Sequence, residues 1–111
     1  MAPTNEAGVI RAITKAIKTN YPKAWIFKTH GGGMQTAGIP DLLVVIEGRM
    51  IALEAKHQRP GATREGTMAR VTRLQQFHLD ALKEAGAVAE VVVSAEEALA
   101  AIEATGLHLT K

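Results

Sequence analysis

Two aliphatic segments separated by a glycine-containing dipeptide restrict the fold of this chain more than any other feature. Leu42 to Ile46 is a continuous run of large aliphatic residues, and Met50 to Lys56 is mainly apolar up to its charged end. Between them, Glu47-Gly48 is suited to a tight antiparallel turn. Continuous apolar runs are typical of strands that are buried on both faces. The pattern therefore predicts a hairpin of two interior strands.

Apolar residues that recur at intervals of three and four indicate three helices around this hairpin. The first helix is expected to be capped by Thr4 or Asn5 and to end near Asn20. The second begins with a capping box of Thr72 and Gln75 and ends at Gly86. The third begins with a second capping box, of Ser94 and Glu97. Their expected buried residues are Val9, Ile10, Ile13 and Ile17; Leu74, Phe77, Leu79, Ala81 and Leu82; and Leu99 and Ile102.

Two further strands complete the prediction, over residues 24–29 and 87–93, and Trp25 and Phe27 are expected in the core. Residues 57–70 have almost no apolar content and are expected to form a mobile loop, and the tail 107–111 is expected to be loosely held. The fold class is thus α/β in the order α-β-β-β-α-β-α, with a mixed, mainly antiparallel sheet flanked by helices. We expect one domain over 1–111.

The composition limits the chemistry that is available. With 47% hydrophobic and 22% charged residues, the chain matches globular proteins. Because it has no cysteine, any metal must bind oxygen or imidazole. The first residues do not resemble a secretion signal, and no apolar run approaches the roughly 20 residues that span a bilayer. We expect a cytoplasmic protein without membrane contact, from a bacterium or a phage-infected host.

Basic residues are concentrated in one stretch, although the net charge is only +2. Five cations occur between Lys56 and Arg73 against the single carboxylate of Glu65, whereas the region from Glu84 to Lys111 is acidic. Such a zone suits a polyanion such as nucleic acid. A solvated loop that binds nothing is an equally open interpretation.

Pairing within the hairpin brings three charged residues together. If Glu47 and Gly48 are the two turn residues, opposite residues have numbers that sum to 95, so Asp41 faces Glu54. Paired residues point to the same side of a sheet, and Lys56, two positions after Glu54, points there too. A bulge or a longer turn would change this register.

Two carboxylates that face each other repel, and a divalent cation would offset the repulsion. Paired hard oxygen ligands favour Mg²⁺ or Mn²⁺, with the backbone carbonyl of Ala55 as a third ligand. Lys56 could then act on the attacking water or on the phosphorane. The alternative is that Glu54 and Lys56 form an ordinary ion pair on one face of a strand.

Several motifs, in order, resemble the VRR-NUC (virus-type replication-repair nuclease) family of the PD-(D/E)XK superfamily. The run from Gly38 to Leu43 is similar to its Gly-x-Pro-Asp-Leu-Leu motif. Residues 51–56 are similar to its Glu-x-Lys strand, and Thr72-x-x-Gln75 to its Ser/Thr-x-x-Gln element. The resemblance covers residues 6–102, and it implies a restriction-endonuclease-like fold.

This resemblance also implies roles for individual residues. Asp41 and Glu54 would bind metal, Lys56 would assist the nucleophile, and Gln75 would lie in the catalytic site. Glu6 matches a family glutamate that contacts metal. Glu6 has a structural alternative, because a carboxylate in the first turn of a helix is favourable there without any metal. Gln75 has one as well, because it can serve only the capping box of its helix.

Together, the residues and the resemblance predict a Mg²⁺- or Mn²⁺-dependent DNA endonuclease without organic cofactor. A homodimer that cuts branched DNA, such as a Holliday junction, is the leading expectation, by analogy alone. The expected DNA contacts are Arg11, Lys15, His30, Arg59, Arg64, Arg70 and Arg73. For His30, an ordinary polar histidine in a loop is the favoured alternative to phosphate contact. A catalytically silent nucleic-acid-binding module and a protein-interaction subunit remain the alternatives.

Overall fold

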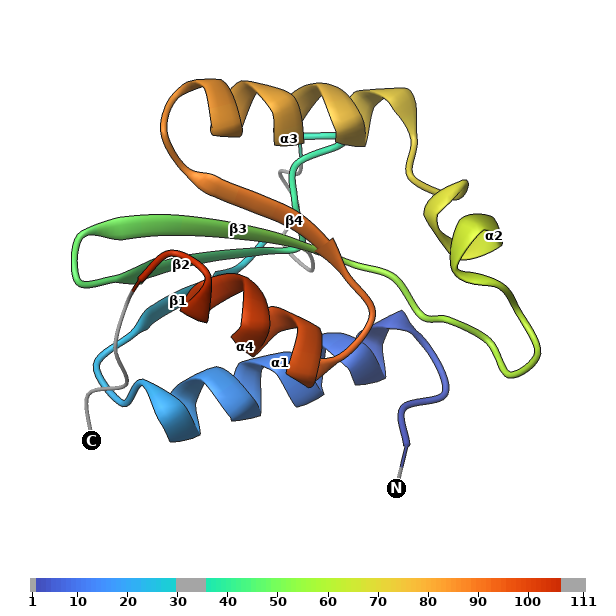
Figure 1. The fold of residues 1–111 in the computed structure, drawn as a ribbon, viewed down its shortest axis with the longest axis horizontal. Coiled ribbons are helices and arrows are strands. Elements are labelled where there is room, and N and C mark those ends of the chain that lie inside the picture. Colours follow the sequence, from blue (N-terminus) through green and yellow to red (C-terminus); the bar gives the residue numbers. More distant parts are fainter. Residues whose placement is uncertain (1, 30–35, 107–111) are drawn as a thin grey trace.

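The computed structural model describes residues 2–29 and 36–106. It contains a four-stranded sheet in the order β1-β2-β3-β4, with helices on both faces (Figure 1). The elements are α1 (Glu6–Asn20), β1 (Trp25–Lys28), β2 (Leu42–Ile46), β3 (Arg49–Ala55), α2 (Arg64–Met68), α3 (Arg73–Glu84), β4 (Val88–Val92) and α4 (Ala95–Glu103). The mixed α/β fold predicted from the sequence is confirmed. None of the helices in the described ranges has the length and apolarity needed to cross a bilayer.

The central hairpin has the predicted register. Leu42 pairs with Leu53, and Ile46 pairs with Arg49, so the turn consists of Glu47 and Gly48 alone. Both turn residues have positive φ, 49° for Glu47 and 80° for Gly48, which gives the backbone twist that a two-residue hairpin requires. β1 is antiparallel to β2, whereas β4 is parallel to β3 after the crossover through α3.

Helices cover the two faces of the sheet unequally. α1 and α4 lie together on one face, and α3 lies alone on the other (Figure 1). The larger core is on the α1 and α4 side, where Ile13 and Ile17 of α1 pack among residues of the strands and Ile102 of α4. The smaller core, around Ala52, Leu79 and Ala89, joins α3 to β3 and β4.

The expected loop over residues 57–70 is wrong in part, because Arg64–Met68 form the short helix α2. Its cap is Thr63, whose side-chain oxygen accepts a hydrogen bond from the Gly66 N–H at 3.0 Å. Arg64 also forms an ion pair with Glu97 of α4. Capping and this ion pair stabilise a turn of helix that has little apolar surface. The expected loose tail, 107–111, lies outside the described residues.

Several apolar residues expected in the core are exposed. Trp25 and Phe27 are 55% and 50% exposed and stack on each other, with ring centroids 5.8 Å apart. Leu74, Phe77 and Ala81 of α3 are exposed as well. The reason is tertiary, because α3 packs on β3 and β4 and leaves the same face of β1 without a helix.

The second capping box is also wrong in part. Ser94 Oγ accepts a hydrogen bond from the Glu97 N–H, as expected for the cap of α4. The Glu97 carboxylate, however, accepts from the Val93 N–H at 3.1 Å, one residue before Ser94. Glu97 thereby links the end of β4 to α4 and, through Arg64, to α2.

The left-handed conformation of Glu47 predicts that asparagine is a better residue there. An L-residue with a Cβ pays about 1 kcal/mol in this conformation, and asparagine tolerates it more readily. Glu47→Asn should therefore raise the free energy of unfolding by roughly 0.5 to 1 kcal/mol, measured by chemical denaturation. Glu90→Asn, on exposed strand backbone of β4, is the control and should not stabilise. Destabilisation by Glu47→Asn would contradict the turn conformation.

Candidate active site

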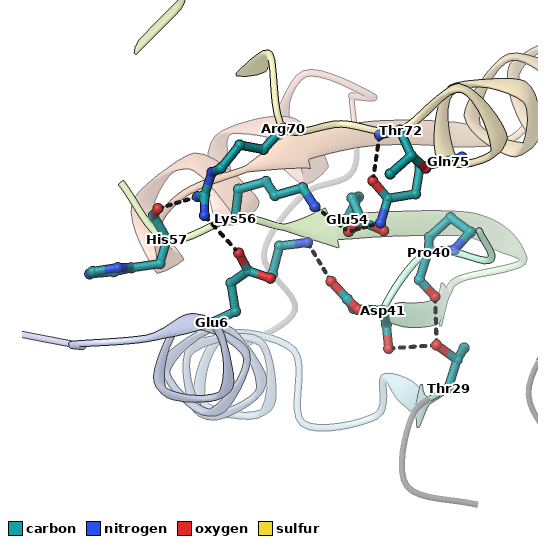
Figure 2. A network of polar contacts seen from close by, with 11 residues as sticks. Glu6, Thr29, Pro40, Asp41, Glu54, Lys56, His57, Arg70, Thr72 and Gln75 are labelled. Atoms are coloured by element: carbon teal, nitrogen blue, oxygen red, sulfur yellow. Dashed lines mark hydrogen bonds and ion pairs between the residues drawn. The ribbon is translucent and has the colours of Figure 1, made fainter. Parts of the chain in front are cut away.

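Asp41 lies at one end of the sheet, directly before β2 (Figure 2). Its backbone is fixed by Thr29, at the end of β1. The Thr29 N–H donates to the Asp41 carbonyl at 2.9 Å, and the Thr29 hydroxyl donates to the Pro40 carbonyl at 2.8 Å. The Pro-Asp segment is thus held against β1 before the chain enters the hairpin.

Gly38 brings this segment against α3. Its φ is +83°, and a Cβ there would lie 2.6 Å from Leu74 Cγ and 2.9 Å from the Leu74 carbonyl carbon. Only glycine satisfies both the backbone conformation and the close approach. The glycine of the Gly-x-Pro-Asp motif therefore lets the chain pass directly over the first turn of α3, which places Asp41 between β1 and α3.

Asp41 and Glu54 are buried side by side, 6% and 2% exposed. The hairpin ladder ends at the pair Leu42 and Leu53, so the next residues on the two strands are Asp41 and Glu54. Asp41 Oδ2 accepts a hydrogen bond of 2.8 Å from the Ala55 N–H. The predicted register is therefore correct, and the Asp41 carboxylate is anchored to the backbone immediately after Glu54.

Two side chains contact the same oxygen of Glu54. Gln75 Nε2 donates to Glu54 Oε2 at 3.1 Å, and the Lys56 ammonium is 3.5 Å from that oxygen. Lys56 is itself only 6% exposed. Figure 2 shows Lys56 and Gln75 approaching Glu54 from β3 and from the start of α3. The other oxygen, Glu54 Oε1, is buried and lacks a hydrogen-bond partner among the described residues.

Gln75 serves the helix cap and the site at once. Its backbone N–H donates to Thr72 Oγ1, and its Oε1 accepts from the Thr72 N–H at 2.9 Å, which completes the predicted capping box. Its Nε2 remains available for Glu54. The two interpretations of Gln75 are compatible, because a side-chain amide both accepts and donates.

Burial dominates the electrostatics of Glu54. The pKa of the Glu54 carboxyl is raised from 4.5 to about 8, first by burial and second by the charge of Asp41. Lys56 opposes this effect by favouring the ionised form. An isolated pair of buried carboxylates thus retains a proton at neutral pH, and a cation that replaces this proton would offset the same repulsion.

The donor set fits a hard divalent cation. Asp41 and Glu54 supply carboxylate oxygens, including the unpartnered Glu54 Oε1, and Ala55, whose N–H donates to Asp41, directly follows Glu54 in the chain. The described residues contain no group of three His, Cys, Asp or Glu side chains arranged for a metal. Two carboxylates with water or substrate oxygens suit Mg²⁺ or Mn²⁺ better than zinc.

Glu6 lies at the edge of this network and contacts a cation of the protein itself. Its carboxylate is 3.3 Å from the Arg70 guanidinium, which also donates to the His57 carbonyl. Arg70 thereby ties the end of the 57–70 segment to α1 and to the residue after Lys56 (Figure 2). Contact of Glu6 with a metal stays a prediction that needs a bridging water or release by Arg70.

The predicted DNA-contacting residues separate into two groups. Arg59 and Arg70 line a hollow of about 280 Å³ beside α2, together with His57, which was not among the predicted contacts. Arg11 and Lys15 line a larger groove along α1, together with Lys18 and Lys28, which sequence reasoning did not single out. The period of α1 could have indicated Lys18, seven residues after Arg11. Arg73 begins α3, and His30 lies outside the described residues.

The raised pKa of Glu54 predicts that the metal-free protein loses stability as pH rises. Folded Glu54 keeps its proton up to about pH 8, whereas the unfolded carboxyl ionises near 4.5. The folded state holds the extra proton between these values, so the free energy of unfolding should fall from about pH 5 to about pH 8, by a few kcal/mol at most.

Chemical denaturation in EDTA across this range measures the effect. Glu54→Gln should remove the decline that Glu54 contributes, while Glu90→Gln on β4 should retain it. An identical pH dependence in wild type and Glu54→Gln would contradict the raised pKa.

Comparison with known proteins supports the same fold. No protein-family model and no curated protein matches the sequence. A solved structure, "VRR_NUC domain", superposes with a TM-score of 0.62 at 20% sequence identity, covering 91% of this chain and 97% of that chain. The similarity expected from the Gly-x-Pro-Asp, Glu-x-Lys and Thr-x-x-Gln motifs is thus confirmed at the level of the fold. The chain therefore has the same fold as this VRR_NUC domain.

Proposed function

We propose that this protein is a Mg²⁺- or Mn²⁺-dependent endonuclease that hydrolyses phosphodiester bonds in DNA. The observation that carries the proposal is the buried pair of Asp41 and Glu54 with Lys56 and Gln75 on the same carboxylate. Burial of three ionisable side chains is costly and needs a compensating use. The VRR_NUC-type fold supports the assignment to nucleases.

The residues have distinct tasks in this proposal. Asp41 and Glu54 would hold the cation, while the Ala55 N–H and Gln75 fix the orientation of the two carboxylates. When bound there, Mg²⁺ or Mn²⁺ supplies positive charge for the phosphate and lowers the pKa of water. Lys56, held by Glu54, would orient the attacking water or neutralise charge on the phosphorane.

A homodimer acting on branched DNA is part of the proposal. Two sites related by a two-fold axis suit a substrate with two strands to cut. Exposed apolar side chains on the α3 side of the molecule support self-association: Trp25 and Phe27 on β1, and Leu74 and Phe77 on α3. The small domain would in this way gain the surface that a junction requires.

Substitution of Glu54 tests the catalytic assignment. Glu54→Gln should lower cleavage of linear, flap and four-way DNA by more than about 100-fold in Mn²⁺, because charge stabilisation worth several kcal/mol is lost. Millimolar Mn²⁺ should raise the melting temperature of wild type but not of Glu54→Gln.

Glu90→Gln is the matched control, since this carboxylate is exposed on β4, and it should behave as wild type. If wild type binds DNA but neither cleaves any substrate nor gains stability from Mn²⁺, the catalytically silent binding module is the correct function. Absence of DNA binding as well would indicate the protein-interaction subunit.

Light scattering tests the dimer. Wild type should have twice the monomer mass, and Phe77→Asp should weaken association by at least about tenfold, because it places a charge on an apolar contact. Phe77 is 62% exposed, so the substitution should leave the monomer folded. Gln76→Asp on the same helix is the control. A monomeric wild type at micromolar concentration would refute the homodimer.

A further inference from the structure

A basic groove runs between α1 and β1, on the sheet face opposite α3. Its volume is about 660 Å³. Ile26 and Lys28 of β1 alternate with Trp25 and Phe27, so they point to the α1 side. The lining residues are Ile10, Arg11, Thr14, Lys15, Lys18, Thr19, Ile26, Lys28 and Leu42.

The charge of this groove is of one sign. Four of its lining residues are cationic and exposed, namely Arg11, Lys15, Lys18 and Lys28, and no carboxylate is among them. None of these four lies within 4.0 Å of a carboxylate in the described ranges. By contrast, Arg64 and Arg70 of the 57–70 segment are paired with Glu97 and Glu6. The groove therefore carries four cations that no carboxylate compensates within the described ranges.

The groove reaches the end of the sheet at which Asp41 precedes β2. Arg11, Lys15 and Lys18 follow one another by four and three residues, so they lie on one stripe, roughly 10 Å long. Leu42, which lines the groove, directly follows Asp41. Lys28 precedes Thr29, whose N–H and hydroxyl hold the Asp41 and Pro40 carbonyls. Lys28 and Leu42 therefore lie at the same end of the sheet as Asp41, although strand alternation points their side chains to the α1 face and those of Asp41 and Glu54 to the α3 face.

We propose that this groove binds the sugar–phosphate backbone of the DNA strand on the Asp41 side of the site, with Lys18 and Lys28 as positioning residues. The inference rests on the proposed function and adds the path of the substrate. A 10 Å row of cations matches about three phosphates of one strand. The apolar floor of Ile10, Ile26 and Leu42 suits sugar rings.

The salt dependence of DNA binding tests the groove. Fluorescence anisotropy with a labelled linear duplex and a labelled four-way junction, in EDTA so that no cleavage occurs, gives affinity against KCl concentration. The double substitution Lys18→Ala/Lys28→Ala should reduce the slope of log K against log salt by about 1.8, since each phosphate contact contributes about 0.9. At about 100 mM salt, affinity should fall at least tenfold.

The control removes the same charge elsewhere. Arg49→Ala/Lys83→Ala changes two cations that line a separate hollow near the start of β3 and the end of α3. Its salt slope should change by less than half as much. Equal losses in the two double variants would show an effect of net charge only, and an unchanged slope in Lys18→Ala/Lys28→Ala would exclude the groove as a DNA contact. Tighter binding of an RNA duplex of the same sequence would overturn the assignment to DNA.

Cleavage kinetics separate this inference from the proposed function. In Mn²⁺ the groove variant should raise KM at least tenfold with kcat within about twofold of wild type, because it removes binding remote from the reacting phosphate. A lower kcat with unchanged KM would contradict a positioning role. If no substrate is cleaved by wild type but the groove variant still loses DNA affinity, the nuclease proposal fails and the groove stands.

Discussion

The burial of two neighbouring carboxylates, Asp41 and Glu54, is the constraint on which the rest of the structure depends. Each is nearly inaccessible to solvent, and their mutual repulsion helps to hold the pKa of Glu54 near 8 in the absence of metal. A fold tolerates such a pair only when hydrogen bonds and nearby cations offset much of the cost. The Ala55 N–H, Gln75 and Lys56 supply these contacts, one from the backbone and two from side chains.

The elements around the pair are arranged to keep it in place. A two-residue turn sets the register of the hairpin, and Thr29, directly after β1, holds the backbone of the Pro-Asp segment. Gly38 allows that segment to contact α3, and the capping box of α3 orients Gln75 toward Glu54. The residues of the Gly-x-Pro-Asp and Thr-x-x-Gln motifs therefore have structural roles as well as chemical ones, because they bring neighbouring elements within reach of the two carboxylates.

The distribution of cations divides the surface into parts with different tasks. Arg64 and Arg70 are used within the protein, where they tie the 57–70 segment to α4 and α1. The cations along α1 and Lys28 have no such partner in the described structure and line a groove on the α1 face of the sheet. In the basic stretch of the sequence, Arg64 and Arg70 thus stabilise the 57–70 segment itself. The groove along α1 is the stronger candidate for contact with a polyanion.

Local rules in the sequence determined the three longer helices, the strands and the hairpin register, but not the short helix α2. The period of Val9, Ile10, Ile13 and Ile17 identified the buried side of α1, and Glu47-Gly48 fixed the pairing that brings Asp41 to Glu54. These features depend on residues close in the chain, for which side-chain period and turn conformation are sufficient. The capping box of Thr72 and Gln75 was determined in the same way.

Only the tertiary structure decided which surfaces are covered. Phe77 and Trp25 have the apolar character of core residues, yet α3 packs over β3 and β4 and leaves both exposed. The pairing of Arg70 with Glu6 and the gathering of Lys18 with Lys28 join residues from different elements. The period of apolar residues indicates which side of a helix or strand is buried. How much of that side is covered depends on where the neighbouring helix or strand lies, and contacts between segments distant in the sequence determine this.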